Sequence, residues 1–330
     1  MKKKLVAVVA LVLIVVLACS LAACNSKSMF DGRFNKEATK EEAASTWKTA
    51  AKAMGGDSEE LATASNDDKE AVKGWKGMKL TYSAKNSSSR VVDDVKTENS
   101  SDVKAEGALL FDGSAMAITG TSTMSGDGKT ATAQVGTYAK DSVLYTNITY
   151  GESALKIKID DKNLGVFGKA IKENVMELTD FSSLALDAVG EIICELPYDE
   201  IVKEFSDFKA YIDNSGKYNR VKYVFTDKMM AEIFGSSDDD SKFEGGCSII
   251  IVTDKDGVFQ GVKLEITSSY ESEDEYLGST YKYSSSQNMS VSIENCDKID
   301  SSMPADLDDY KDVKEMTLQE VTDFFKAVLQ

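Results

Sequence analysis

Few residues in this chain could carry out covalent or acid–base chemistry near neutral pH. The 330 residues include no histidine and only five cysteines. Without an imidazole the chain cannot build a Ser-His-Asp triad, it lacks the commonest general base, and it cannot form most kinds of zinc site. The cysteines and the carboxylates are therefore the groups whose positions decide what chemistry is possible.

Two glycine-containing stretches resemble ligand loops but lack essential positions. Residues 126–130, GDGKT, mimic the end of a phosphate-binding loop, but Thr123 stands where that motif has its first glycine. A calcium loop counted from Asp254 has Glu265 at its twelfth position, but Phe259 occupies the sixth, where the sharp turn needs glycine. Both stretches are better explained as hairpin turns, so the sequence predicts no metal site and no cofactor.

The carboxylates do not single out a catalytic pair. With 55 acidic residues, close pairs arise by chance, and no Gly-x-Ser-x-Gly elbow or β-lactamase motif set is present. We predict that the protein is not an enzyme and has no catalytic residue. An enzyme of the cell wall or membrane surface is the third hypothesis, and it would need a cleft with two converging carboxylates.

The first 23 residues have the layout of an export signal. Three lysines precede an apolar run of 13 residues, 5–17, and small residues follow. The tetrad Leu21, Ala22, Ala23 and Cys24 resembles the lipobox of bacterial lipoproteins. That resemblance implies cleavage before Cys24 and a diacylglyceryl group on its sulfur. An uncleaved transmembrane anchor is the alternative, since such a helix needs about 20 apolar residues.

Lipidation at Cys24 would fix where the protein lies and how it is divided. Each buried methylene contributes about 0.8 kcal/mol, so two or more acyl chains hold a protein firmly on a membrane. We expect the protein on the extracytoplasmic face, with residues 1–23 as the signal peptide, 24–35 as the lipidated N-terminus and tether, and 36–330 as one α+β domain. The mature chain has 35 basic and 55 acidic residues, a net charge of −20, which disfavours nucleic acid as a partner.

The remaining cysteines, Cys194, Cys247 and Cys296, have two interpretations. Each stands beside apolar residues, which favours small buried side chains. An exported protein can also form disulfides, so a bridge between Cys247 and Cys296 is the alternative.

The hydrophobic pattern predicts helices at the two ends and in the middle, with sheet between them. Short runs rich in Thr, Tyr, Val and Ile lie at 78–84 and between 108 and 159, with turn signals between them, which indicates an antiparallel meander. A hairpin is expected at 248–267 with Asp256-Gly257 at its tip, and its unbroken apolar run 249–252 indicates a strand covered on both sides. Capping boxes at Thr39 and Thr317 predict an N-terminal and a C-terminal helix. Helical stripes are also expected within residues 163–208. Two polar segments, 86–104 and 268–286, carry no decisive pattern, and we expect the first to be a ragged edge or a loop.

The order of these elements resembles the LolA-like and LppX-like extracytoplasmic lipoproteins. The residues concerned are the lipobox, the hairpin GTYAKDSVLYTNIT, the helical block 163–208 and the strand RVKYVFTD. The resemblance implies a curved antiparallel half-barrel with helices against its concave side. It also implies that the protein carries or senses an apolar or lipid-like ligand.

The candidate ligand-lining residues lie in the apolar helix expected at 184–196. Val189, Ile192 and Ile193 would line a cavity under the sheet, or they would simply pack in the core. The leading hypothesis is a non-enzymatic, lipid-anchored protein that binds an apolar or amphipathic ligand. The alternative is an envelope interaction module that docks a protein or a glycan on its sheet, with no internal ligand. The sequence does not identify a protein partner.

Overall fold

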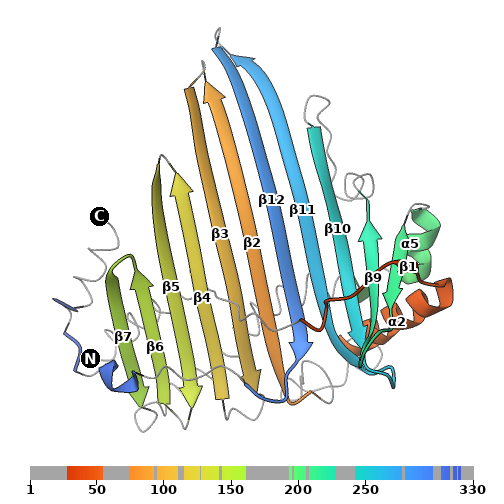
Figure 1. Ribbon diagram of the computed structural model, residues 1–330, viewed down its shortest axis with the longest axis horizontal. Helices are drawn as coiled ribbons and strands as arrows, with labels where there is room; N and C mark the ends of the chain where they lie inside the picture. The colour runs from red at the N-terminus through yellow and green to blue at the C-terminus, as the bar shows by residue number, and fades with distance from the viewer. Residues whose placement is uncertain are drawn as a thin grey trace.

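A computed structural model of the chain describes residues 28–54, 75–92, 95–110, 115–126, 128–140, 143–160, 193–194, 197–205, 208–226, 242–276, 279–299, 306–312, 315–317 and 319–320. These residues form one 13-stranded sheet, almost entirely antiparallel, with few helices (Figure 1). The sheet therefore makes up a larger share of the described residues, and the helices a smaller one, than the α+β prediction implied.

Two meanders make up the sheet. The first is β2 (Gly77–Val92), β3 (Val95–Leu110), β4 (Ala115–Gly126), β5 (Lys129–Lys140), β6 (Val143–Tyr150) and β7 (Ser153–Asp160). The second is β8 (Lys209–Asp213), β9 (Asn219–Phe225), β10 (Lys242–Thr253), β11 (Phe259–Tyr276) and β12 (Ser279–Asn295). Pairing between β12 and β2 joins them into one sheet. The edges are two-residue strands, β1 (Lys36–Glu37) beside β8 and β13 (Lys311–Asp312) parallel to β7; a short 3-10 helix, η2 (Leu307–Asp309), precedes β13.

Two of the expected turns between strands are confirmed. Gly257, at the tip predicted for the β10–β11 hairpin, has a φ of +82°, a conformation that glycine adopts without steric cost. Gly128 ends the β4–β5 turn in the same conformation, with a φ of +74°. The stretch that mimics a phosphate-binding loop is therefore a hairpin, as predicted.

The polar segments that the sequence left unassigned are the longest strands of the sheet. Residues 86–104, taken as a ragged edge or loop, lie instead in β2 and β3, which pair continuously from Gly77 with Leu110 to Val92 with Val95. Residues 268–286 lie mostly in β11 and β12, paired from Gly261 with Glu294 to Tyr276 with Ser279. Backbone pairing with neighbouring strands holds these polar segments extended, which side-chain propensity alone does not predict.

Two α-helices have their bounds within the described residues. The first, α2 (Lys40–Ala53), opens on the predicted capping box, in which Thr39 and Glu42 exchange side-chain-to-backbone hydrogen bonds of 3.2 and 2.9 Å. The second, α5 (Tyr198–Glu204), begins after Pro197. Neither is long and apolar enough to cross a membrane, and no other helix of the described part is.

The other predicted helices lie largely outside the described residues. The Thr317 and Glu320 contacts of the second capping box are present, with a bond of 2.7 Å from the Thr317 N–H to Oε2 of Glu320. Residues 321–330, which would complete the C-terminal helix, lie outside the described residues, as do 163–192 of the middle block.

Both helices pack on one face of the second meander, the helix face. Trp47 of α2 is 2 % exposed, meets Tyr223 of β9 edge-on at 4.8 Å between ring centroids, and donates its indole N–H to the Ile193 carbonyl at 3.0 Å. Tyr223 in turn donates its hydroxyl to the Ala43 carbonyl at 2.7 Å. Ile249 and Ile251 of β10 complete this core from the sheet side.

The opposite face of the second meander carries the segment 28–35, which we name the strap. Phe30 is 3 % exposed and packs with Ile250 and Val252 of β10. The run 249–252 is therefore covered on both sides, as its unbroken apolar pattern predicted. A Cβ at Gly261 would lie 3.1 Å from Cζ of Phe30 and 2.6 Å from a backbone oxygen of β12, so this close approach requires glycine.

The strap covers residues 28–35 of the segment 24–35 predicted as the lipidated N-terminus and tether, and polar contacts hold it to the sheet. The backbone N–H of Arg33 donates to Asp213 at 2.9 Å, and Arg220 donates to the Met29 carbonyl. Asp213 and Arg220 are themselves buried, with 3.7 Å between their charged atoms. The apolar side chains of Met29, Phe30 and Phe34 explain why the segment binds the sheet instead of water.

Candidate functional site

The central strands extend well beyond the helices, as Figure 1 shows. We call this extension the distal sheet: residues 85–92, 95–102, 123–126, 129–132, 267–276 and 279–288. Its side chains are mostly Ser, Thr, Asn, Gln and charged residues. Large apolar side chains here are exposed, Met124 at 60 % and Val95 at 69 %, so the distal sheet is not covered by a core layer at these points.

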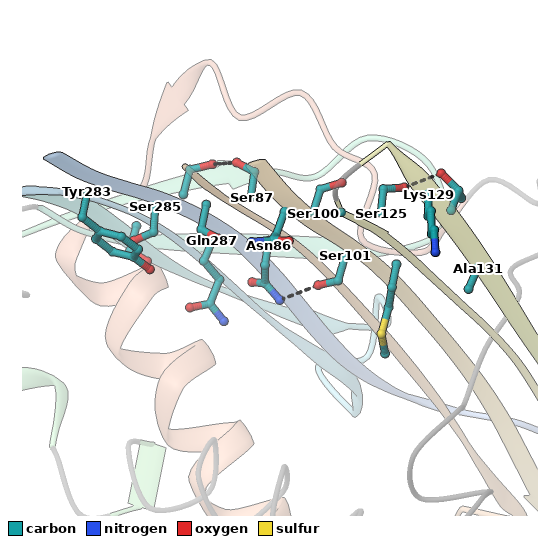
Figure 2. A pocket seen from close by; sticks show the side chains of 17 residues that line it. Asn86, Ser87, Ser100, Ser101, Ser125, Lys129, Ala131, Tyr283, Ser285 and Gln287 are labelled. Atoms are coloured by element: carbon teal, nitrogen blue, oxygen red, sulfur yellow. Dashed lines mark hydrogen bonds between the residues drawn. The ribbon is translucent and has the colours of Figure 1, made fainter. Parts of the chain in front are cut away.

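A hollow of about 760 Å³ lies on the helix face of the distal sheet. Figure 2 shows Asn86, Ser101, Lys129 and Gln287 pointing to this side. The amide of Asn86 donates to the Ser101 hydroxyl at 3.2 Å, which fixes the orientation of that amide. The pairing register of the strands places these side chains next to one another, because Asn86 on β2 lies opposite both Ser101 on β3 and Gln287 on β12.

Tyr283 closes one end of this hollow with an exposed aromatic ring. Its side chain is 41 % exposed, and its ring centroid lies 6.1 Å from that of Tyr270 on β11. The neighbouring tyrosine limits the rotamers that Tyr283 can adopt without closing off its outer ring face. An aromatic ring that is both exposed and supported can stack on an apolar ring face of a ligand.

The chemistry of this hollow is that of a neutral polar site. Hydroxyls, amides, one tyrosine and one methionine line it, Lys129 supplies the single cation, and no carboxylate is among its lining residues. Side-chain amides donate and accept at once, so they match ligands that present hydroxyl groups. These groups can hold a ligand through hydrogen bonds.

A second hollow, of about 630 Å³, lies mainly on the opposite face of the same strands. Alternation along a strand places Ser87, Ser100 and Ser125 on this side, and Figure 2 shows them pointing away from Asn86 and Gln287. The two hollows are therefore back to back on one layer of sheet.

On the face that carries the strap and the second hollow, charged residues gather at the end of the sheet away from the distal sheet. Lys79 lies 3.0 Å from Glu106 and 3.7 Å from Glu294, and Glu265 lies 3.3 Å from Lys222 and 2.7 Å from Lys263. Burial raises the pKa of Glu294, while the neighbouring Lys79 opposes that shift. Lys79 links three strands and Lys222 reaches Glu265 two strands away, whereas Lys263 and Glu265 lie on the same strand, so each carboxylate of this group has a cationic partner.

Of the predicted ligand-lining residues the structure describes Ile193, and it lies at neither hollow. Ile193 is 1 % exposed and belongs to the hydrophobic core, beside Trp47. The core interpretation therefore holds for Ile193, while Val189 and Ile192 lie outside the described residues. Leu21, Ala22, Ala23 and Cys24 lie outside them as well.

The cysteine alternatives are resolved against the disulfide. Cys247 on β10 lies opposite Ile266, whereas Cys296 follows the end of β12 and donates to the Lys298 carbonyl at 2.8 Å. Ile266 pairs with Met289, seven residues from Cys296, so roughly 23 Å of strand separates the two thiols. Burial raises the pKa of Cys247 to about 12, which makes it an inert core thiol, as the favoured interpretation predicted.

The calcium-like stretch is a turn, as predicted. The Asp254 carboxylate accepts hydrogen bonds from the backbone N–H groups of Asp256 and Val258 at 3.0 and 2.9 Å. Within the described part of the chain, no cluster of three or more Cys, Asp and Glu side chains could hold a metal ion.

One feature of the sequence indicates that the strands around the helix-face hollow could form a binding surface, namely their serine and tyrosine content. Segments 86–104 and 268–286 are both rich in serine, and the second also in tyrosine, which suits a sheet surface that contacts sugars or protein. Only the register shows that Asn86, Ser101 and Gln287 meet. No protein-family model matches the chain, and no curated protein matches it either.

Proposed function

We propose that this protein is a lipid-anchored extracytoplasmic binding protein whose distal sheet docks a neutral glycan on its helix face. The observation that carries the proposal is the hollow bounded by Asn86, Gln287 and Tyr283. It combines side-chain amides, one of them held in place by a hydrogen bond, with hydroxyls and one exposed aromatic ring, and no carboxylate is among its lining residues. This proposal develops the alternative stated from the sequence, an envelope interaction module that docks a protein or a glycan, and it selects a neutral glycan from the chemistry of the lining residues.

The charge of the molecule supports a neutral occupant. The chain has a net charge of −17, and Lys129 is the single cation among the residues that line the hollow. An acidic polymer would meet repulsion with little compensation. A sugar ring offers hydroxyls to the amides and an apolar face to the tyrosine.

The hypothesis of a lipid-like ligand, the leading one from sequence, stays a prediction. In the described residues the apolar space under α2 and α5 is filled by side chains such as Trp47 and Ile193. The half-barrel with helices against its concave side also stays a prediction, since most of the middle block lies outside those residues.

Titration calorimetry with linear β-1,4-linked oligosaccharides of N-acetylglucosamine and of glucose tests the glycan proposal. The full chain should be purified in a detergent that has no sugar head group. Tyr283→Ala should weaken binding about tenfold, which corresponds to ~1.4 kcal/mol, because the stacking surface is lost. Tyr283→Phe, which keeps the ring, should bind within about twofold of the wild type.

The circular dichroism spectrum should be the same for both variants, since Tyr283 lies outside the core. If none of the oligosaccharides binds the wild type, or if Tyr283→Ala binds as well as Tyr283→Phe, the glycan proposal is wrong.

A further inference from the structure

We propose that the hollow on the helix face, the helix-face hollow, selects sugars that carry an N-acetyl group, and that Met124 and Ser101 recognise this group. The inference rests on the proposed function and deepens it, because it names the class of glycan that the same site takes. The acetyl methyl packs on the Met124 side chain, and the acetyl carbonyl oxygen accepts a hydrogen bond from the Ser101 hydroxyl.

Two of the exposed large apolar side chains of the described residues lie at this hollow. They are Met124, which is 60 % exposed, and Tyr283. One exposed apolar residue on a protein surface needs no explanation, but two at a single, otherwise polar hollow are typical of a ligand site. Tyr283 offers a ring face for stacking, whereas Met124 offers a flexible thioether that adapts to a small apolar group.

The pairing register places Met124 between a methyl group and a hydroxyl group. Met124 on β4 lies opposite Ser101 on β3 on one side and opposite Ala131 on β5 on the other. Directly opposite residues share a face and have Cβ atoms about 5 Å apart. Met124, Ala131 and the Ser101 hydroxyl therefore form one small patch of the hollow, with an apolar part and a polar part.

The neighbouring Asn86 determines what the Ser101 hydroxyl can do. The Asn86 amide donates to the Ser101 oxygen at 3.2 Å, so this oxygen already accepts one hydrogen bond. A hydroxyl also carries one proton to donate. Within the part of the chain that the structure describes, the Ser101 proton has no protein acceptor, so it is available to a carbonyl oxygen of a ligand. Asn86 is thus a positioning residue for Ser101.

An N-acetyl group matches both parts of this patch. Its carbonyl oxygen accepts a hydrogen bond, and a methyl group is attached to the same carbon. With the oxygen on Ser101, the methyl lies within reach of Met124 on the adjacent strand. A sugar hydroxyl in the same place could also bond to Ser101, but it would leave Met124 against a polar group or water. The patch therefore discriminates between the two kinds of sugar.

Two substitutions at residue 124 test the recognition of the methyl. Met124→Gln keeps the length of the side chain but makes its end polar, whereas Met124→Leu keeps it apolar. The ligands are β-1,4-linked oligosaccharides of N-acetylglucosamine and of glucose, of equal length, titrated into the full chain in a detergent without a sugar head group. The wild type and Met124→Leu should prefer the N-acetylated ligand at least fivefold. In Met124→Gln the preference should fall below about twofold.

A matched pair at residue 101 tests the hydrogen bond. Ser101→Ala removes the hydroxyl and Ser101→Thr keeps it. The affinity for the N-acetylated ligand should fall at least threefold in Ser101→Ala and change less than twofold in Ser101→Thr. Equal affinities of the two variants would overturn the role of Ser101.

A spectroscopic measurement shows the contact with Met124 directly. In protein labelled with carbon-13 at its methionine methyl groups, the Met124 signal is identified by its absence from the spectrum of Met124→Leu. This signal should shift when the N-acetylated ligand is added and shift much less with the glucose ligand. A Met124 signal that does not respond to the bound N-acetylated ligand would overturn the contact.

The outcomes keep this inference apart from the proposed function. If the glucose ligand binds the wild type as tightly as the N-acetylated one, while Tyr283→Ala still weakens binding, selection of the N-acetyl group is wrong and the glycan site stands. The same holds if Met124→Gln keeps the preference of the wild type. A wild type that binds neither oligosaccharide would overturn both proposals.

Discussion

At the scale of single residues, the buried charges of the sheet are more informative than its exposed ones. Lys79 stands between Glu106 and Glu294 across three neighbouring strands, so one cation serves two carboxylates. The closer partner is Glu106, and Glu294 is left in a poorly hydrated position with the weaker contact. Burial therefore raises the pKa of Glu294, so the folded protein holds this proton to a higher pH than the unfolded chain does.

This shift gives a pH dependence with a definite sign. Above the unfolded value of about 4.5 the native state binds more protons than the unfolded chain, so stability falls as the pH rises toward the raised folded value. Glu294→Gln should remove that fall and be more stable than the wild type at pH 7. Urea midpoints measured between pH 4 and pH 8 check this.

Glu37→Gln is the matched control, because it changes the net charge equally at an exposed position. If the wild type and Glu294→Gln lose stability in parallel as the pH rises, burial of Glu294 has no thermodynamic effect.

At the scale of elements, the strap is the feature that most changes the expected organisation. Three apolar side chains and two polar contacts hold it to the second meander. Hydrogen bonds from Ser215 and Arg33, together with the Arg220 charge, lower the pKa of Asp213 although burial opposes this. The Asp213 contribution to stability is therefore present above about pH 4 and is lost as the pH falls through the lowered value.

Phe30→Ala should release the strap from the sheet. The buried ring is replaced by a cavity, so we expect the free energy of unfolding to fall by about 3 kcal/mol. Trypsin should cleave after Arg33 faster than in the wild type, because the strap opens more often. Val95→Ala, at a side chain that is 69 % exposed, is the control and should change neither quantity. An unchanged cleavage rate in Phe30→Ala would show that the polar contacts alone hold the strap.

The sequence predicts the elements whose determinants are local. The capping box of α2, the tip of the β10–β11 hairpin and the two-sided burial of residues 249–252 each depend on a few neighbouring residues, and each is confirmed. The distal strands depend on distant pairing instead. Ser87 is held by Ser286, about 200 residues away in sequence, and serine alone does not favour a strand. The helix-face hollow arises from that same register, so its residues could not be grouped in advance.

At the scale of the whole molecule, the strap determines where the proposed anchor meets the sheet. Cys24 precedes Ser28 by four residues, a reach of at most ~14 Å. Phe30 lies against Gly261 of β11, and the distal sheet begins at Thr267, six residues or ~20 Å further along that strand. Acyl chains on Cys24 would therefore hold the base of the sheet close to the bilayer, with the proposed glycan site further along the strands.

Loss of the sulfur at residue 24 should release the protein from membranes. In Cys24→Ser the acyl acceptor is absent, so incorporation of labelled palmitate should stop and the protein should move to the soluble fraction. Cys19→Ser is the control, because the tetrad that ends at Cys19, Val16-Leu17-Ala18-Cys19, has a bulky leucine where the lipobox prefers a smaller residue. This variant should be lipidated normally. Membrane retention of Cys24→Ser without label would identify an uncleaved transmembrane anchor instead.

The strands shorten from 16 to 18 residues at β2, β3, β11 and β12 to two residues at β1 and β13. A long, flat outer strand would offer unpaired backbone groups to another copy of the protein, and that is how sheets come to assemble into fibres. In the described part of the chain the longest strands, which are rich in serine and would be hazardous at an edge, lie in the centre, where both of their sides are paired. The outermost strands are the shortest, so they offer a second copy of the protein a shorter stretch of backbone to pair with.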